Sequence, residues 1–468
     1  MRSTFAGLEL GKNALAAQQY AIDTAGHNIS NAGTKGYTRQ VSNLVTSIPN
    51  VISAMGHNVS IGSGVTIESI SRIRDAFVDR QFRWETSKEQ YWSEKLYFQS
   101  NIQAFFNEPA DDSLHKDLSN FWIAWSELSK DPENSGARAL VLERGRTLVD
   151  SFHRLAQQLT DLENDLKSKV QVQVDQINSY ASQIKDLNMQ IQRAEVAGDT
   201  PNDLYDARDK LVDELSKIVS VRVTETQDSN FKDRYVGVFK IEIASEVATA
   251  GQELVLVDHD QVWELQGEEA EDPPPNFSFS LVGSDTKTFN LESSQMGSLA
   301  AEVELLDKYL PGIMGELDKL VQDIVENVND FYTKNGSYPD AFFDGLSAAD
   351  IALNSSITED NLRTGDGNIG DGSIASKIAA LSGSIGDSYG TLIARLGANV
   401  QQSERMAQGE AVLLNQLLNQ KESVSGVSLD EEMTNIIKFQ KSYAAAARLV
   451  TVLDDMLEKI ISGMGITR

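Results

Sequence analysis

One short segment fits a catalytic pattern. Residues 386–390, Gly-Asp-Ser-Tyr-Gly, match the Gly-x-Ser-x-Gly nucleophile elbow of serine hydrolases. That elbow needs a strand before it, a helix after it and a histidine base later in the chain. Residues 375–381 have a helical pattern instead, and every histidine precedes Ser388: His27, His57, His115, His153 and His259. We therefore expect no serine nucleophile.

Metal chemistry has equally little support. Residues 366–372, Asp-Gly-Asn-Ile-Gly-Asp-Gly, resemble half of a calcium loop, but lack the oxygen ligand at the fifth position and a correctly spaced glutamate. No histidines are spaced four apart, and cysteine is absent, which excludes thiolate zinc sites and disulfides. The sequence predicts no catalytic residue, no metal site and no cofactor, so we do not expect an enzyme.

The charge excludes nucleic acid as a partner. The 468 residues carry a formal charge of −28, which repels phosphate backbones, and no basic stripe offsets it. Residues 1–90 are the exception, with nine basic and seven acidic side chains, so the remaining chain carries −30. A near-neutral segment can pack against copies of itself without repulsion. No stretch is long and apolar enough to span a membrane, and no cleavable signal opens the chain.

The two ends of the chain have the clearest helical pattern. Apolar residues recur every seven positions at both ends: Leu8, Leu15, Ile22 and Ile29, then Leu429, Ile436, Tyr443, Val450 and Leu457. Burying each large side chain contributes about 1.5–3 kcal/mol. Ordering each residue costs about 1–2 kcal/mol, so the C-terminal helix needs a partner. We expect the two helices to pair with each other and with neighbouring copies, and to be mobile in the monomer.

The C-terminal helix also shows a start signal and a second apolar register. Ser428 and Glu431 have the spacing of a capping box, in which each side chain bonds a free N–H of the other position. We place the second register of this helix four residues after the first, at Met433, Gln440, Ala447 and Ile461.

Long helices are predicted for most of the middle of the chain. An aromatic stripe with a seven-residue period predicts one buried helix face: Phe77, Trp84, Tyr91, Phe98 and Phe105. Residues 140–191 form a longer helix whose apolar register slips by one residue before Val170 without ending it. A shorter helix follows over 204–218, another over 299–331 with a break at Pro311, and a last one over about 385–420.

Between these helices the period changes to two. Alternating apolar residues around Val221, Phe239, Leu254 and Phe277 predict strands of a small antiparallel insert. The fold class is therefore mainly α, a long helical bundle or coiled coil formed by both halves of the chain, with a β-rich insert. We divide it into a terminal helical domain (1–50 and 428–468), a helical-bundle middle domain (51–220 and 292–427) and the insert (221–291).

Several segments together resemble one known family. Residues 27–31 (His-Asn-Ile-Ser-Asn) and 36–40 (Gly-Tyr-Thr-Arg-Gln) are similar to the N-terminal signature of the flagellar rod, hook and hook-associated proteins. The second segment points to the hook-associated branch. Further segments agree with that family: 62–65, 75–77, 202–204, 208–209 and 423–432. The resemblance covers both termini and most of the helical scaffold.

The resemblance implies a structural, extracellular role. Such proteins leave the cell unfolded through the flagellar type III pathway and polymerise as a short ring at the hook–filament junction. The implied partners are other copies of the chain, the hook protein, the second junction protein, and an export chaperone at the C-terminal helix. Two alternatives stay open: a hook or distal-rod subunit, and a flagellum-associated peptidoglycan hydrolase. Rod and hook members usually lack the long helix with the slipped register.

Overall fold

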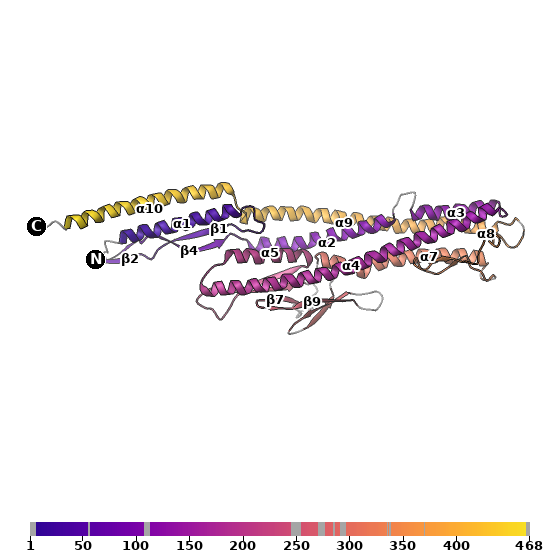
Figure 1. Ribbon diagram of the computed structural model, residues 1–468, viewed down its shortest axis with the longest axis horizontal. Coiled ribbons are helices and arrows are strands. Elements are labelled where there is room, and N and C mark those ends of the chain that lie inside the picture. The colour runs from indigo at the N-terminus through magenta and orange to yellow at the C-terminus, as the bar shows by residue number, and fades with distance from the viewer. Residues whose placement is uncertain are drawn as a thin grey trace.

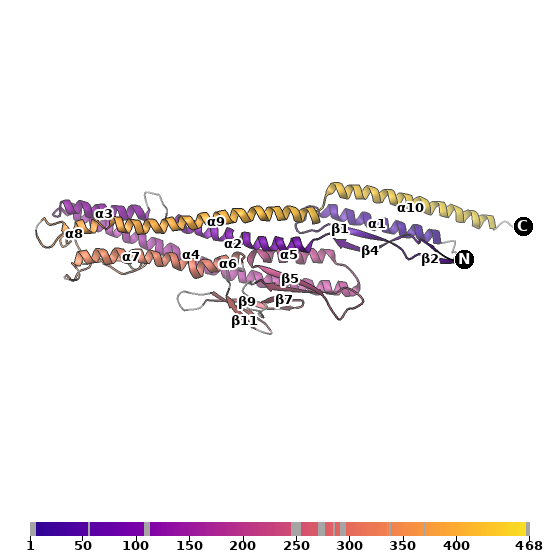
Figure 2. The ribbon, with the colours of Figure 1, turned by 180° about the vertical axis from the view of Figure 1, so that it is seen from behind.

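The computed structural model describes residues 6–54, 57–106, 113–244, 254–269, 277–283, 286–290, 296–334, 336, 338–368 and 370–464. It is an elongated molecule with both termini at the same end (Figure 1). Two helices form that end, a long helical body forms the rest, and small sheets lie along one side of the body (Figures 1 and 2). The fold class is the mainly helical one with a β-rich insert that the sequence predicts.

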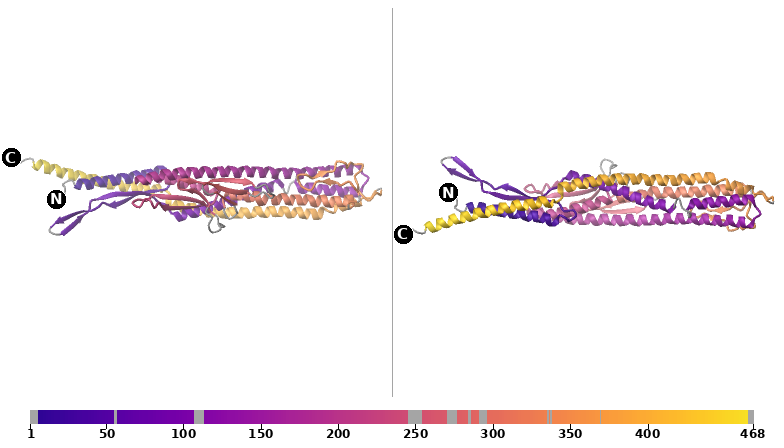
Figure 3. Two further views of the ribbon diagram at one scale, coloured as in Figure 1. Left: turned by 90° about the horizontal axis from the view of Figure 1, so that it is seen from below. Right: turned by 90° about the horizontal axis from the view of Figure 1, so that it is seen from above.

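The first and last helices pack side by side. Helix α1 spans Ala6–Asn31 and helix α10 spans Leu429–Met464, and we call them together the terminal pair. Strand β1 (Gln40–Thr46) pairs antiparallel with β4 (Val65–Arg72), and both strands contact α1. Their hairpin continues into β2 (Asn50–Ala54) and β3 (His57–Ile61), which diverge from the terminal pair in Figure 3. The domain boundary expected at residue 50 falls inside this hairpin.

The body consists mainly of helices laid lengthwise. Helix α2 runs beside α9, and α3 packs on α4. The bounds are Ala76–Phe106 for α2, Leu114–Lys130 for α3, Ser135–Ala197 for α4, Asn202–Ile218 for α5, Ser373–Ala379 for α8 and Ser382–Ser425 for α9. Two very short strands, β12 (Phe343–Asp344) and β13 (Ala352–Leu353), pair in the loop region before α8. Among the described residues, no helix has the length and hydropathy needed to cross a membrane.

Helix α4 confirms the long helix with a slipped register. Its predicted apolar residues are all buried, before and after the slip: Leu148, Phe152, Leu155, Leu159, Leu162, Leu166, Val170, Ile177, Ile184 and Ile191. The helix runs unbroken for 63 residues and ends at Gly198, whose φ of 86° lies in the left-handed region that glycine adopts without strain. A one-residue slip therefore turns the apolar face slightly without ending the helix.

The aromatic stripe on α2 is only partly buried. Tyr91 and Phe98 are in the core, Trp84 and Phe105 are half-buried, and Phe77 is 56% exposed. The prediction of a fully buried stripe is therefore wrong at its first residue. Near that end the buried face of α2 contains Asp79 and Arg83 instead, because Arg83 pairs with Asp213 of α5 and Asp79 pairs with Arg74.

The helix predicted to break at Pro311 does not break there. Helix α6 (Ser298–Glu304) passes through a π-helical turn, η2 (Leu305–Tyr309), into α7 (Leu310–Thr333), where Pro311 lies in the first turn. Proline has no N–H to donate, and the first turn of a helix does not need that donor. The wider π-turn allows the helix to continue up to the proline.

The insert forms two antiparallel sheets against α4. The first has the order β5 (Val221–Gln227), β6 (Gly237–Ile243), β7 (Val255–Asp258) and β8 (Gln261–Val262); the second has β9 (Glu264–Glu269), β10 (Phe277–Val282) and β11 (Lys287–Asn290). All four predicted strands are present. Asn178 of α4 bonds both the N–H and the carbonyl of Leu265, at 2.8 Å each, as a neighbouring strand would. The sheets share one apolar core with the bundle.

Candidate assembly interface

The terminal pair is antiparallel and closely packed. Gly7 lies against Leu453, Gly11 against Val450, and Asn28 near the other end contacts Glu432. A Cβ atom at Gly11 would lie 2.5 Å from Val450 Cγ2, so glycine is needed for this approach. The buried residues of α1 are all small or polar: Gly11, Ala17, Ala21, Thr24, Ala25 and Asn28. The expected pairing of the two ends is confirmed.

The predicted interface residues are not all on the contact face. On α1, Leu8, Leu15, Ile22 and Ile29 are half-buried, beside the small residues that make the closest contact. On α10, Ile436, Val450 and Leu457 are half-buried, whereas Leu429 is 52% and Tyr443 38% exposed. Their role in contacts between copies stays a prediction.

The second register predicted for α10 is wrong at three of its four positions. Met433 is 59% and Ile461 71% exposed, and Gln440 is also exposed, whereas Ala447 is half-buried. The less exposed positions come one residue earlier: Glu432, Phe439, Ala446 and Leu453. They follow the first register by three residues, the a-to-d spacing of a coiled coil. The polar Glu432 in this register conceals the pattern in the sequence.

A large apolar surface of α10 has no partner within the described chain. The side chains that are more than a third exposed include Ile437, Leu449, Val452, Met456 and Ile460, in addition to Leu429, Met433, Tyr443 and Ile461. Exposed apolar side chains gathered on one helix mark an interaction site. Helix α1 therefore covers only part of the apolar surface of α10.

The signature residues form a polar joint between the terminal pair and the body. Asn28 Nδ2 donates to the Gln40 carbonyl (2.8 Å), and its Oδ1 accepts from the Gln40 N–H (3.0 Å) and the Tyr37 hydroxyl (2.8 Å). The Thr38 N–H donates to Asp206 Oδ2 of α5 at 2.8 Å. Burial, and then the carboxylates Asp203, Asp206 and Glu432, raise the pKa of Tyr37 well above its usual value, so its hydroxyl remains a donor.

Arg39 connects this joint to α10. Its Nε donates to Glu432 Oε1 at 2.7 Å, and its Nη1 lies 2.8 Å from Glu431 Oε2. Glu432 is 3% exposed and also accepts from Asn28 Nδ2 at 3.1 Å. The Glu431 N–H donates to Ser428 Oγ at 3.5 Å, which is the first half of the predicted capping box. The Glu431 side chain pairs with Arg39.

A second group of charges, the arginine–aspartate cluster, lies beside the joint. It contains Arg72, Arg74, Arg83 and Lys421 together with Asp79, Asp206, Asp209 and Asp213. Asp209 accepts from Arg72 at 2.9 Å, from Arg74 at 2.7 Å and from Arg83 at 3.3 Å. Burial opposes ionisation of Asp209, but these arginines hold its pKa well below its usual value. Four positive and four negative side chains thus join β4, α2, α5 and α9.

The joint and this cluster are functional candidates that were not predicted from the sequence. Nothing in the local sequence pattern predicts that the segments similar to the family meet in space: 27–31, 36–40, 202–204, 208–209 and 423–432. One signal was present, because Asp206, Asp209 and Asp213 are spaced three and four residues apart on one helix face. The arginines that bind them are more than 100 residues away in the sequence, which no local pattern reveals.

The two chemical motifs do not form sites. Ser388 lies inside α9 and its hydroxyl donates to the Ser384 carbonyl. Asp371 accepts from the backbone of Asp366 and Ser373, as in a surface turn. Residue 369 lies outside the described residues, and among those described no three His, Asp or Glu side chains group as a metal site.

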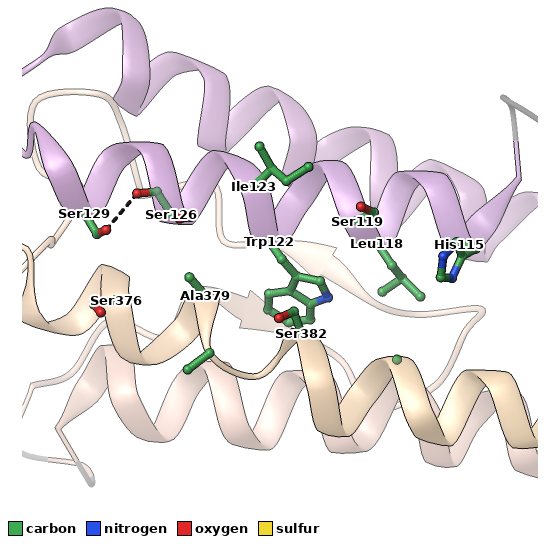
Figure 4. A pocket seen from close by; sticks show the side chains of 12 residues that line it. His115, Leu118, Ser119, Trp122, Ile123, Ser126, Ser129, Ser376, Ala379 and Ser382 are labelled. Atoms are coloured by element: carbon green, nitrogen blue, oxygen red, sulfur yellow. Dashed lines mark hydrogen bonds between the residues drawn. The ribbon is translucent and has the colours of Figure 1, made fainter.

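A cavity of about 530 Å³ lies nearby, between α3 and the α8–α9 segment (Figure 4). Trp122 points toward Ser382 across it, while Ile123 points away. Its polar lining is His115 and several serines, with no carboxylate, so it lacks an acid–base pair.

Comparisons with known proteins agree with the resemblance. The family model described as the flagellar hook-associated protein FlgK helical domain matches residues 99–342. The flagellar hook-associated protein 1 of Bacillus subtilis is 32% identical over all of this chain and 99% of its own length. The chain belongs to the flagellar hook-associated protein 1 family.

Other matches distinguish the ends from the middle. The models for the flagella basal body rod protein and the flagellar basal body rod FlgEFG protein C-terminal match residues 8–38 and 420–463. Hook-associated protein 1 of Salmonella typhimurium is 34% identical over 45% of this chain and 37% of its own. The solved structure of the flagellar hook junction protein FlgK from Burkholderia pseudomallei has a TM-score of 0.48 at 20% identity, covering 57% of this chain and 46% of that one.

These matches decide between the alternatives left open by the sequence. The rod-protein models match the two ends of the chain, which include Asn28, Tyr37 and Glu432 of the joint, whereas the bundle matches the hook-associated helical domain. A hook or rod subunit and a hydrolase find no support beside the full-length match to hook-associated protein 1. The chain is a structural component of the flagellum.

Proposed function

We propose that the subunit polymerises into a short ring at the tip of the flagellar hook. Membership of the hook-associated protein 1 family makes it a structural protein of the hook–filament junction. The observation that carries the polymerisation is the apolar surface of α10 that α1 leaves uncovered. Covering such a surface contributes about 25 cal/mol per Å², and neighbouring copies of the same helix can provide the cover.

In this ring the terminal pair lines the inner tube, the body surrounds it and the insert faces outward. The near-neutral charge of residues 1–90 supports this arrangement, because closely packed copies of that segment do not repel one another. Residues 91–428, which carry nearly all of the negative charge, belong at larger radius, where copies are further apart. The sheets lie to one side of the body, away from the terminal pair (Figure 2).

The ring would contact the hook protein on one face and the second hook–filament junction protein on the other. Before assembly the chain would leave the cell unfolded through the flagellar type III pathway, with an export chaperone on α10. The absence of cysteine suits this route, because an unfolded chain then cannot cross-link. The exposed apolar residues of α10 suit a chaperone that covers them until secretion.

The test uses exposed apolar residues of α10 that do not support the α1 contact. Ile437→Asp and Met456→Asp, at positions 54% and 55% exposed, should leave the thermal unfolding of the monomer unchanged but prevent filament attachment. Glu458→Lys is the control on the same helix and should assemble. Val450→Asp should instead weaken the α1–α10 contact. Normal filaments with both Ile437→Asp and Met456→Asp would contradict polymerisation through this surface.

A further inference from the structure

A carboxyl group is fully buried in the body at the point where the insert returns to it. Glu302 of α6 has no exposed surface and lies among residues of α2 and α4. Its Oε1 accepts from Gln173 Nε2 at 2.8 Å and lies 3.1 Å from Lys169 Nζ. Its Oε2 is buried with no hydrogen-bond partner among the described residues. An ionised carboxylate with one bare buried oxygen is unfavourable.

The charges around Glu302 do not balance if it is ionised. Lys169 on α4 also pairs with Glu94 on α2, so one ammonium group is shared by two carboxylates. The next acidic residue, Glu304, is already engaged by Tyr91 and by Lys95 at 2.8 Å. The neighbouring residues of η2, Leu305 and Leu306, are apolar and buried. A proton on Glu302 restores neutrality and removes the bare anionic oxygen.

We propose that Glu302 is a proton-binding latch, which holds α6 between α2 and α4 while protonated and loosens this contact when it loses the proton in alkaline surroundings. The position gives the latch a structural effect. Gly297, just before α6, has φ of 101°, its N–H donates to the Ser87 carbonyl, and a Cβ there would lie 2.4 Å from the Ile218 carbonyl oxygen. The segment that leaves the insert is therefore docked tightly between α2 and α5, five residues before Glu302.

The direction of the pH effect follows from burial. Desolvation raises the pKa of Glu302 from 4.5 to about 8, with Lys169 opposing and Glu94 adding to the rise. A carboxyl whose folded-state pKa is raised stabilises the fold fully below the unfolded-state value, and this stability is lost as pH rises through the folded-state value. The window is therefore from about pH 4.5 to about pH 8. The latch concerns the single subunit and does not depend on ring formation.

Amide exchange of residues 298–304 tests the latch. Corrected for intrinsic rates, their protection should fall about 90-fold between pH 6 and pH 9 in the wild-type chain. Glu302→Gln keeps the shape without the titration, so its protection should change by less than about twofold. Glu304→Gln, which removes a neighbouring acid, should keep the wild-type pH dependence. An equal fall in the wild type and Glu302→Gln, or no fall in the wild type, would overturn the proposal.

A direct titration covers the case in which Glu302→Gln fails to fold. In the wild-type chain labelled with ¹³C at glutamate carboxyls, one resonance should titrate near pH 8, and it should be unaffected in Glu304→Gln. Absence of any glutamate resonance that titrates above about pH 6.5 would reject the latch without using a Glu302 variant.

Discussion

The arginine–aspartate cluster gives the sharpest stability prediction. Asp209→Asn keeps the size of the side chain but removes the negative charge that Arg72, Arg74 and Arg83 share. Breaking a buried ion pair from one side typically costs 3–5 kcal/mol. Each arginine keeps one aspartate here, namely Asp206, Asp79 and Asp213 respectively. We therefore expect the lower end, about 3 kcal/mol, or about a 160-fold rise in the unfolding constant.

The assay is urea unfolding of the full chain, followed by circular dichroism at pH 7. Asp186→Asn is the matched control. Asp186 is likewise a helical aspartate in an ion pair, here with Lys185, but it is 64% exposed. Exposed ion pairs contribute at most about 1 kcal/mol. If Asp209→Asn destabilises the body no more than Asp186→Asn does, the cluster does not hold the body to the hairpin as we argue.

The pH dependence of this difference has a definite sign. The pKa of Asp209 is lowered by the arginines, so its contribution is present above the usual value of 3.8 and is lost as pH falls toward the folded-state value. The difference between the wild type and Asp209→Asn should be constant from pH 5 to pH 8 and shrink below about pH 4. A difference that shrinks with rising pH instead would contradict the ion-pair account.

Two further predictions concern α10. Deleting residues 428–468 should abolish filament attachment and leave the helicity and urea midpoint of the body unchanged, because none of the α10 residues whose burial is described belongs to the apolar core. A misfolded body would refute this. Glu432→Ala should speed amide exchange in the first turns of α10 by about 30-fold or more, since the buried hydrogen bonds to Arg39 and Asn28 are lost. Glu431 is 62% exposed, so Glu431→Ala should change the same exchange rate by less than fivefold, a loss of about 1 kcal/mol or less. Equal effects of Glu431→Ala and Glu432→Ala would contradict our placement of the joint.

Helices and strands with a single buried face were predictable from the sequence. The apolar positions of α4 repeat from Leu148 to Ile191, and the predicted strands β6 and β10 alternate buried and partly exposed residues. Such patterns result from burial within the chain, so periodicity alone identifies them. Strand β9 has no such pattern. Its one buried apolar side chain is Leu265, and Asn178 of α4 bonds the backbone of that residue.

The contact face of α10 could not be predicted in full. Its apolar residues serve two surfaces, one against α1 and one left uncovered, so the sequence shows more apolar positions than a single seam needs. Glu432 then occupies a seam position because Arg39 and Asn28 satisfy it. A buried acid whose partners are distant in the sequence looks like a solvated residue. The second register of α10 was therefore predicted one residue too late, at Met433 and not at Glu432.

The chemistry of the joint suits its place between the terminal pair and the body. Helix α9 ends at Ser425 and α10 begins at Leu429, so three residues separate them, and the chain alone would permit many angles between the two helices. The contacts that choose one angle are hydrogen bonds and ion pairs of Asn28, Arg39 and Glu432, which require defined directions. Apolar contacts of equal strength would tolerate sliding. In the proposed ring, one misdirected terminal pair would block its neighbour, and a directional joint suits that arrangement.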